Sequence, residues 1–251
     1  MTSPAARHMM RVSASETAQR VASPLRNATA YEQMLVKLAA DNRTLKQIRS
    51  NERKADKKRE LLPFYLPWVA GVLASGKGAQ DDIVMTVMLW RLDADDIAGA
   101  LEIARYAMTY GLTMPTGRRP TPYLLAEEVA LAAQRLRGAK QPVELANLLD
   151  TLALTERADM PDIVRAKLHK ITGYVLRDAK QLPEALAHLQ RATQLESTIG
   201  VRKDIEQLER QLRPKPEPAP KTKTTKPRTR KPAAKPAARR GRPPKAAKAA
   251  G

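Results

Sequence analysis

The sequence predicts an all-α protein with a long N-terminal helix, an array of antiparallel, tetratricopeptide-like helical hairpins and a disordered basic C-terminal tail. Ala and Leu are abundant and aromatic residues make up only 4% of the chain, which favours helices because Ala and Leu lose little on entering one. Apolar residues recur at spacings of three and four, and no alternation typical of strands occurs. Lys, Arg and Pro are concentrated in the last 39 residues.

The N-terminal region divides into a loose segment and a helix. Residues 1–29 are polar and rich in small side chains, and Pro4 and Pro24 interrupt them, so we expect a flexible lead-in. A long helix is predicted over residues 30–62, because no Gly or Pro occurs there. Thr29 followed three residues later by Glu32 is the signature of a capping box at the start of that helix.

The two halves of this predicted helix differ in character. The first half carries an apolar stripe that needs a partner, formed by Leu35, Leu38 and Leu45. The second half is basic, and six cations fall at steps that can share a face: Arg43, Lys46, Arg49, Arg53, Lys57 and Lys58. A basic helix can enter a major groove of DNA. Alternatively, interleaved acids such as Glu52 and Asp56 pair with these cations on a solvated or coiled-coil face.

Residues 63–212 are predicted to form the body of helical hairpins. Its first segment, residues 61–73, combines Phe64, Tyr65 and Trp68 with two prolines, and we expect it to dock the long helix onto the body. Gly and Pro between residues 111 and 122 mark the longest internal loop. The expected helices are Asp81–Leu92, Asp95–Tyr110, Thr121–Arg137, Val143–Thr155, Pro161–Arg177, Pro183–Leu195 and Val201–Arg213.

Two segments of the body, Leu92–Ala107 and Arg177–Ala192, can be aligned with each other. Small residues occur at matching positions, Ala100 and Ala107 in one copy and Ala185 and Ala192 in the other. Such residues recur where the helices of a tetratricopeptide hairpin pack closely, and Gly173 also fits this pattern. Any antiparallel helical hairpin needs small residues for the same steric reason, so an ordinary hairpin is the alternative.

The tail, residues 213–251, holds 14 of the 45 Lys and Arg residues, 9 of the 19 prolines and one of the 26 acids. Its net charge is therefore +13, whereas the other 212 residues carry +6. Such a segment cannot bury enough apolar surface to offset the entropy of ordering it. We expect a disordered arm that binds a polyanion, and nucleic acid fits better than membrane because the chain has no apolar anchor.

Near its end the tail contains Arg239-Arg240-Gly241-Arg242-Pro243-Pro244-Lys245, which resembles the AT-hook of chromatin proteins. Because Gly241 has no side chain, an extended Arg-Gly-Arg backbone can sit deep in the narrow A·T minor groove, with Arg240 and Arg242 along its floor. The residues predicted to contact DNA are Arg239, Arg240, Gly241, Arg242, Pro243, Lys245 and Lys248. The alternative is a plain cationic tail that binds phosphates without preference for a groove.

Several patterns that suggest enzymes have simpler explanations. The stretch from Gly71 to Gly78 resembles a phosphate-binding loop, but Gly78 replaces the hydroxyl that holds Mg²⁺, so we predict a helix end at Gly76. Three acidic pairs are predicted to lie at helix starts and to cap them: Asp81/Asp82, Asp95/Asp96 and Glu127/Glu128. The three histidines, His8, His169 and His188, have no zinc-site spacing. We predict no catalytic residue, metal or cofactor.

The chain contains no cysteine, no stretch long enough to span a bilayer and no secretory signal. These observations suit a reducing cytoplasm and a chain that does not enter a membrane.

The order of several segments resembles one known family. They include Tyr31–Ala40, Lys58–Phe64, Gly78–Ile83, Met85–Asp93, Asp96–Ala107, Tyr110–Pro115, Ala166–Gly173 and Ala187–Leu195. These stretches are similar to the small terminase subunit, or terminase endonuclease subunit, of peduovirus-type temperate tailed phages. The similarity runs through about Arg213 and continues as a shared basic, proline-rich tail.

The resemblance implies a role in packaging phage DNA in the cytoplasm of the host bacterium. Such a subunit binds double-stranded DNA at the cohesive-end (cos) site and recruits the large subunit, which holds the ATPase and the nuclease. Small terminases commonly form oligomers, and Leu35, Leu38 and Leu45 are the residues predicted to mediate self-association here. Two alternatives remain: a metal-dependent endonuclease that uses the acidic pairs, and a nucleoid-type helical scaffold with a cationic tail.

Overall fold

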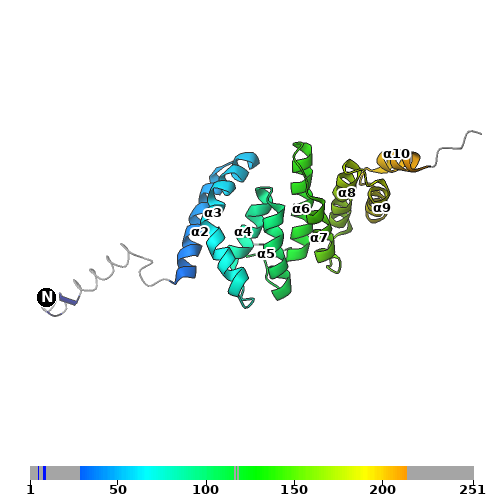
Figure 1. The fold of residues 1–251 in the computed structure, drawn as a ribbon. Coiled ribbons are helices and arrows are strands. Elements are labelled where there is room, and N and C mark those ends of the chain that lie inside the picture. The colour runs from blue at the N-terminus through cyan, green and yellow to red at the C-terminus, as the bar shows by residue number, and fades with distance from the viewer. Residues whose placement is uncertain (1–4, 6–7, 10–28, 116, 118, 214–251) are drawn as a thin grey trace, which may run out of the picture. The chain divides into compact units, whose positions relative to one another are not determined.

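The structure is a computed structural model that describes residues 5, 8, 9, 29–115, 117 and 119–213. The chain divides into two units, residues 1–213 and 214–251. From residue 29 to 213, all regular elements are α-helices, which confirms the all-α class (Figure 1). In chain order these are α2 (Ala30–Gln47), α3 (Asn51–Ser75), α4 (Asp82–Asp93), α5 (Ile97–Tyr110), α6 (Thr121–Gly138), α7 (Leu145–Thr155), α8 (Asp162–Asp178), α9 (Leu182–Leu195) and α10 (Arg202–Leu212).

The predicted single helix over residues 30–62 is wrong, because the structure divides it into α2 and α3. The backbone is extended at Ile48 and Ser50, and the Ser50 hydroxyl accepts a hydrogen bond from the N–H of Arg53. A hydroxyl in this place competes with helix continuation and favours a new start. The predicted capping box of Thr29 and Glu32 at the start of α2 is confirmed.

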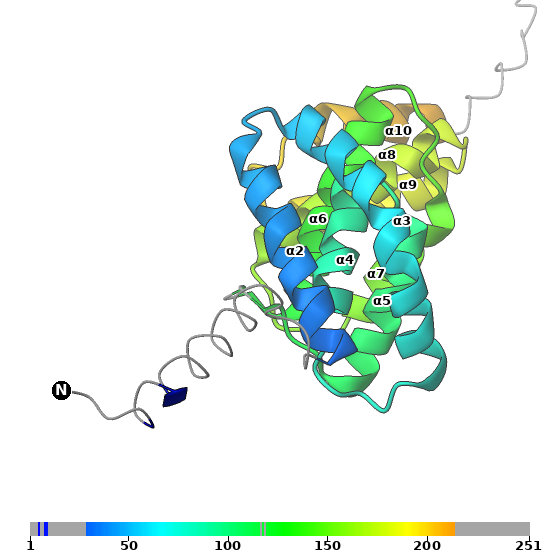
Figure 2. The same cartoon turned by 90° about the vertical axis from the view of Figure 1, so that its left-hand side faces the viewer.

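The break lets two apolar stripes reach the same core. Leu38 and Leu45 of α2 are buried, and so are Tyr65 and Val69 of α3. Figure 2 shows α2 and α3 side by side in front of α4, against which both helices pack. A straight helix rises about 1.5 Å per residue and could not bring both stripes to one place.

Helix α3 continues through Pro63 and Pro67 instead of ending before them. Each proline lacks an N–H and weakens the helix locally. Packing offsets this loss, since Tyr65 is fully buried, donates a hydrogen bond to the Asp41 carboxylate at 2.6 Å and meets Trp90 edge-on. The aromatic segment therefore docks onto the body as predicted, but it does so inside a helix.

Three hairpin turns share one geometry, and two of them are the segments aligned above. In each turn the backbone forms the two hydrogen bonds of a Schellman motif after α4, α6 or α8. The residue in the left-handed conformation is Asp95, Lys140 or Lys180, with φ of 65°, 57° and 65°. A side chain in this conformation costs roughly 1 kcal/mol relative to Gly. The body is therefore an array of hairpins, and the tetratricopeptide-like detail stays a prediction.

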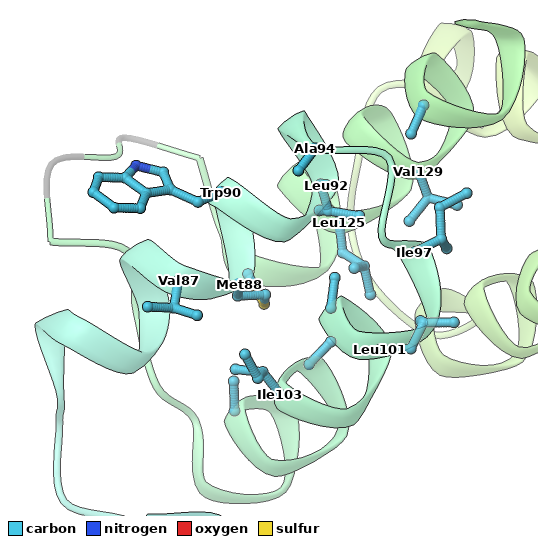
Figure 3. Close-up of a cluster of buried hydrophobic side chains, with 14 of the residues drawn as sticks. Val87, Met88, Trp90, Leu92, Ala94, Ile97, Leu101, Ile103, Leu125 and Val129 are labelled. Carbon is cyan, nitrogen blue, oxygen red and sulfur yellow. The ribbon is translucent and has the colours of Figure 1, made fainter. Parts of the chain in front are cut away.

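The core of the body lies where α4, α5 and α6 meet. Met88, Leu92, Leu101 and Leu125 are at most 1% exposed, and Figure 3 shows them gathered from the three helices. A smaller cluster joins α8, α9 and α10 around Leu189 and is listed as Leu176, Ala185, Leu189, Val201 and Leu208. Both clusters hold the hairpin turns in fixed positions, and the candidate site lies at these turns.

Candidate nucleic-acid interface

The connection between α2 and α3 forms a basic tip, which we define as residues 43–54. Of the predicted DNA-binding residues, Arg43 and Lys46 lie near the end of α2, Arg49 lies in the connection and Arg53 begins α3. The side chains of Lys58 and Arg59 bond to Asp93 and Ala94 at the α4–α5 turn. Because α3 begins about seven residues before them, the tip extends roughly 10 Å beyond that turn.

The six cations predicted on this helix differ in how free their charges are. Lys46, Arg49 and Arg53 are exposed, and among the described residues their side chains form no ion pair. Lys57 pairs with Glu60 at 2.6 Å, and the Arg43 Nε donates to the Ala39 carbonyl. Lys58 pairs with Asp93, and its side chain is only 14% exposed. The three free cations are therefore best placed to meet an anion, while DNA contact by all six stays a prediction.

A charged recess of about 520 Å³ lies beneath the tip, between α3, the α4–α5 turn and α6. Asp95 anchors it by accepting from Arg59 at 3.2 Å and from Arg135 at 2.9 Å. Its lining residues are Asn51, Glu52, Lys54, Ala55, Asp56, Lys58, Arg59, Asp93, Asp95 and Arg135. Sequence reasoning missed Arg59 and Arg135 here, because their shared partner Asp95 is distant from both along the chain.

Burial raises the pKa of the Glu128 carboxyl on α6, and the neighbouring Asp93 and Glu127 carboxylates raise it further. The pair Glu127/Glu128 lies inside α6, so the prediction that it caps a helix start is wrong. Glu127 instead pairs with Arg119 across the loop that precedes α6. The other pairs do cap: Asp81 accepts from two N–H groups of α4, and Asp96 accepts from the N–H of Gly99.

The remaining enzyme-like patterns also take structural places. Gly71 lies inside α3 and Gly76 caps its C-terminus, as predicted, so the stretch does not form a phosphate-binding loop. His169 and His188 face each other across the α8–α9 hairpin with their Nδ1 atoms 3.0 Å apart. No cluster of three or more His, Cys, Asp or Glu residues able to hold a metal occurs in the part of the chain that the structure describes.

The apolar stripe predicted for self-association already has partners within the chain. Leu38 and Leu45 are each 5% exposed, and Leu35 packs against the same core. Their burial therefore needs no second copy, and self-association through them stays a prediction. An open groove of about 630 Å³ runs beside Leu35 and Leu38 toward Met114 and Pro115.

The predicted tail contacts, from Arg239 to Lys248, lie outside the described residues. Among the helices that are described, none has the length and apolarity needed to cross a membrane.

Comparison with known proteins adds independent information. Residues 35–163 match the family model described as phage small terminase subunit. The chain is 68% identical over 248 residues to the terminase, endonuclease subunit of Escherichia phage P2, which covers 98% of this chain and all of the relative. It is 26% identical over 191 residues to the probable terminase, endonuclease subunit of Haemophilus phage HP1, covering 70% of this chain and 68% of that relative. No solved structure matches the chain.

Proposed function

The chain belongs to the phage small terminase subunit family, which acts in packaging phage DNA, and from this premise we propose that it is the DNA-recognition and recruitment subunit of its terminase. It binds double-stranded DNA at the cohesive-end site and recruits the large ATPase and nuclease subunit there. Family membership removes the alternative of a nucleoid-type scaffold. We place this work in the cytoplasm of the host bacterium and expect a homo-oligomer.

The observation that carries this proposal is the distribution of free positive charge. The basic tip presents Lys46, Arg49 and Arg53 to solvent on a rigid pair of helices. The tail adds a net charge of +13 and an AT-hook-like motif. A rigid basic element can read a groove, whereas a flexible cationic segment supplies affinity that depends little on sequence. The body therefore sets the address, and the tail holds or scans the DNA.

Removing the tail tests this division. We would compare the full chain with a protein that ends at Arg213, using a cohesive-end duplex and a scrambled duplex at about 50 mM and about 200 mM salt. The shortened protein should bind both duplexes more weakly and keep its preference for the cohesive-end duplex. A thermal melt confirms that it is folded. Equal binding of both duplexes by the folded, shortened protein would contradict a body that sets the address.

An intrinsic metal-dependent endonuclease is the second candidate, because both relatives are named endonuclease subunits. The acidic residues are engaged elsewhere, however: Asp96 caps α5, and Asp95 binds two arginines. The purified chain should therefore not cut a cohesive-end duplex with Mg²⁺. Cutting that disappears in the Asp95→Ala, Asp96→Ala double variant, with DNA binding retained, would establish this alternative.

A further inference from the structure

Lys140 and Lys180 occupy the left-handed position of two equivalent hairpin turns, after α6 and α8. The surrounding sequence is the same in both, Ala-Lys-Gln at residues 139–141 and 179–181. Glycine is the usual residue at this position, and Asn the next, because other side chains are strained there. Two lysines at equivalent strained positions need an explanation.

The third turn of this type has an explanation within the chain. Asp95 holds the same position after α4, and its carboxylate binds Arg59 and Arg135. Lys140 and Lys180 differ, because both are exposed and neither side chain has a partner among the described residues. A positive charge near a helix C-terminus is favourable, but Arg135, Arg137 and Arg177 already supply it in the last turns of α6 and α8. The strain at Lys140 and Lys180 thus brings no visible benefit inside the molecule.

Both lysines lie on one continuous edge of the hairpin array, which we call the turn edge. Arg135 joins the end of α6 to the α4–α5 turn through Asp95, and Arg137 joins it to the α8–α9 turn through Asp178 at 2.8 Å. At the other end, the bonds from α3 to Asp93 and Ala94 join this edge to the basic tip. Free cations therefore occur at both ends of a connected surface: Lys46, Arg49 and Arg53 at the tip, and Lys140 and Lys180 at the turns.

We infer that the turn edge lies along the phosphate backbone of double-stranded DNA, with Lys140 and Lys180 as phosphate contacts beyond the basic tip. This inference rests on the proposed function, that the body binds DNA. A DNA strand presents a line of phosphates, which matches cations spread along an edge. A lysine ammonium is a point charge that accepts a phosphate from many directions and needs no bidentate geometry. An acidic surface of a protein partner is the competing occupant.

The test uses the full chain with Lys140→Asn and Lys180→Asn together. Asn removes the charge but tolerates the left-handed conformation, so the variant should melt at the same temperature as the unaltered chain or higher. Binding to the cohesive-end duplex is measured over a series of salt concentrations. The loss of two phosphate contacts should lower the slope of log K against log salt by about 2 and weaken binding about tenfold at low salt. The matched control, Lys77→Gln with Lys167→Gln, removes two exposed lysines elsewhere and should leave the slope unchanged.

Equal slopes in the Asn variant, the control and the unaltered chain would overturn the inference and leave the proposed function standing. Unchanged DNA binding together with weaker binding of the purified large subunit would also overturn it, and would assign the turn edge to a protein partner. If the unaltered chain binds no DNA, the proposed function itself fails, and this outcome is recognised without any variant.

Discussion

Gly173 shows at the scale of one residue how closely the hairpins of this protein pack. A Cβ atom added there would lie 2.7 Å and 2.8 Å from two side-chain carbons of Leu189 and 3.2 Å from the Ala185 carbonyl oxygen. Ala185 and Ala192 of α9 are fully buried against the same helix. The small residues that the sequence alignment singled out are therefore the ones that let α8 and α9 approach.

We expect Gly173→Ala to lower the free energy of unfolding by about 1–3 kcal/mol, because the Ala185 backbone cannot retreat. Gly71→Ala is the matched control, since a Cβ added to Gly71 meets nothing within 4 Å. That variant should gain up to about 1 kcal/mol from the better helix propensity of Ala. Urea unfolding of both variants measures the two changes. Effects of the same sign would show that close approach of α8 and α9 does not limit the residue at position 173.

At the scale of a hairpin, the pair His169 and His188 joins α8 to α9 in a neutral hydrogen bond. Burial lowers the pKa of His169 to about 4, with smaller contributions from His188 and from the nearby Arg191 and Arg165. Burial also lowers the pKa of His188. In the unfolded chain both histidines take up a proton near pH 6.5. Because the folded state binds fewer protons between these values, stability falls as the pH drops from about 6.5 toward about 4.

We therefore expect the unfolding free energy to fall by on the order of 2 kcal/mol between pH 7.5 and pH 4.5 through this pair. His169→Asn should remove much of that dependence, since an amide can keep a hydrogen bond to His188 without titrating. His8→Asn is the control, because His8 is exposed and should leave the pH dependence unchanged. Urea unfolding at a series of pH values checks both. An unchanged pH profile in His169→Asn would show that other groups cause the acid sensitivity.

The sequence predicted most helices within a few residues, because Gly, Pro and acidic caps mark their ends locally. It did not predict the break at Ser50 or the passage of α3 through Pro63. Both depend on tertiary packing, since two apolar stripes must meet one core and the buried Tyr65 holds the proline-containing turn. For the same reason, the sequence placed Lys58 among the DNA-binding cations, although Asp93, 35 residues away, pairs with it.

At the scale of the whole molecule, charge is divided between two units with different properties. The last 39 residues carry a net +13 in a segment without an apolar core, and the remainder carries +6 on a folded array. Composition alone predicted the first as a polyanion-binding segment. The second required the structure, because free cations become distinguishable from paired ones only when their partners are placed. The two kinds of charge should respond differently to substitution.

Neutralising the basic tip in the full chain, with Lys46→Gln, Arg49→Gln and Arg53→Gln, tests that difference. Because the tail remains, binding to a scrambled duplex should weaken only a few fold. Discrimination between the cohesive-end and scrambled duplexes should fall by tenfold or more, since lost base-specific contacts typically cost about 1–3 kcal/mol. The control variant, Lys77→Gln, Arg157→Gln and Lys167→Gln, removes the same charge from exposed positions elsewhere and should keep the discrimination. Equal discrimination in both variants would place the address outside the α2–α3 tip.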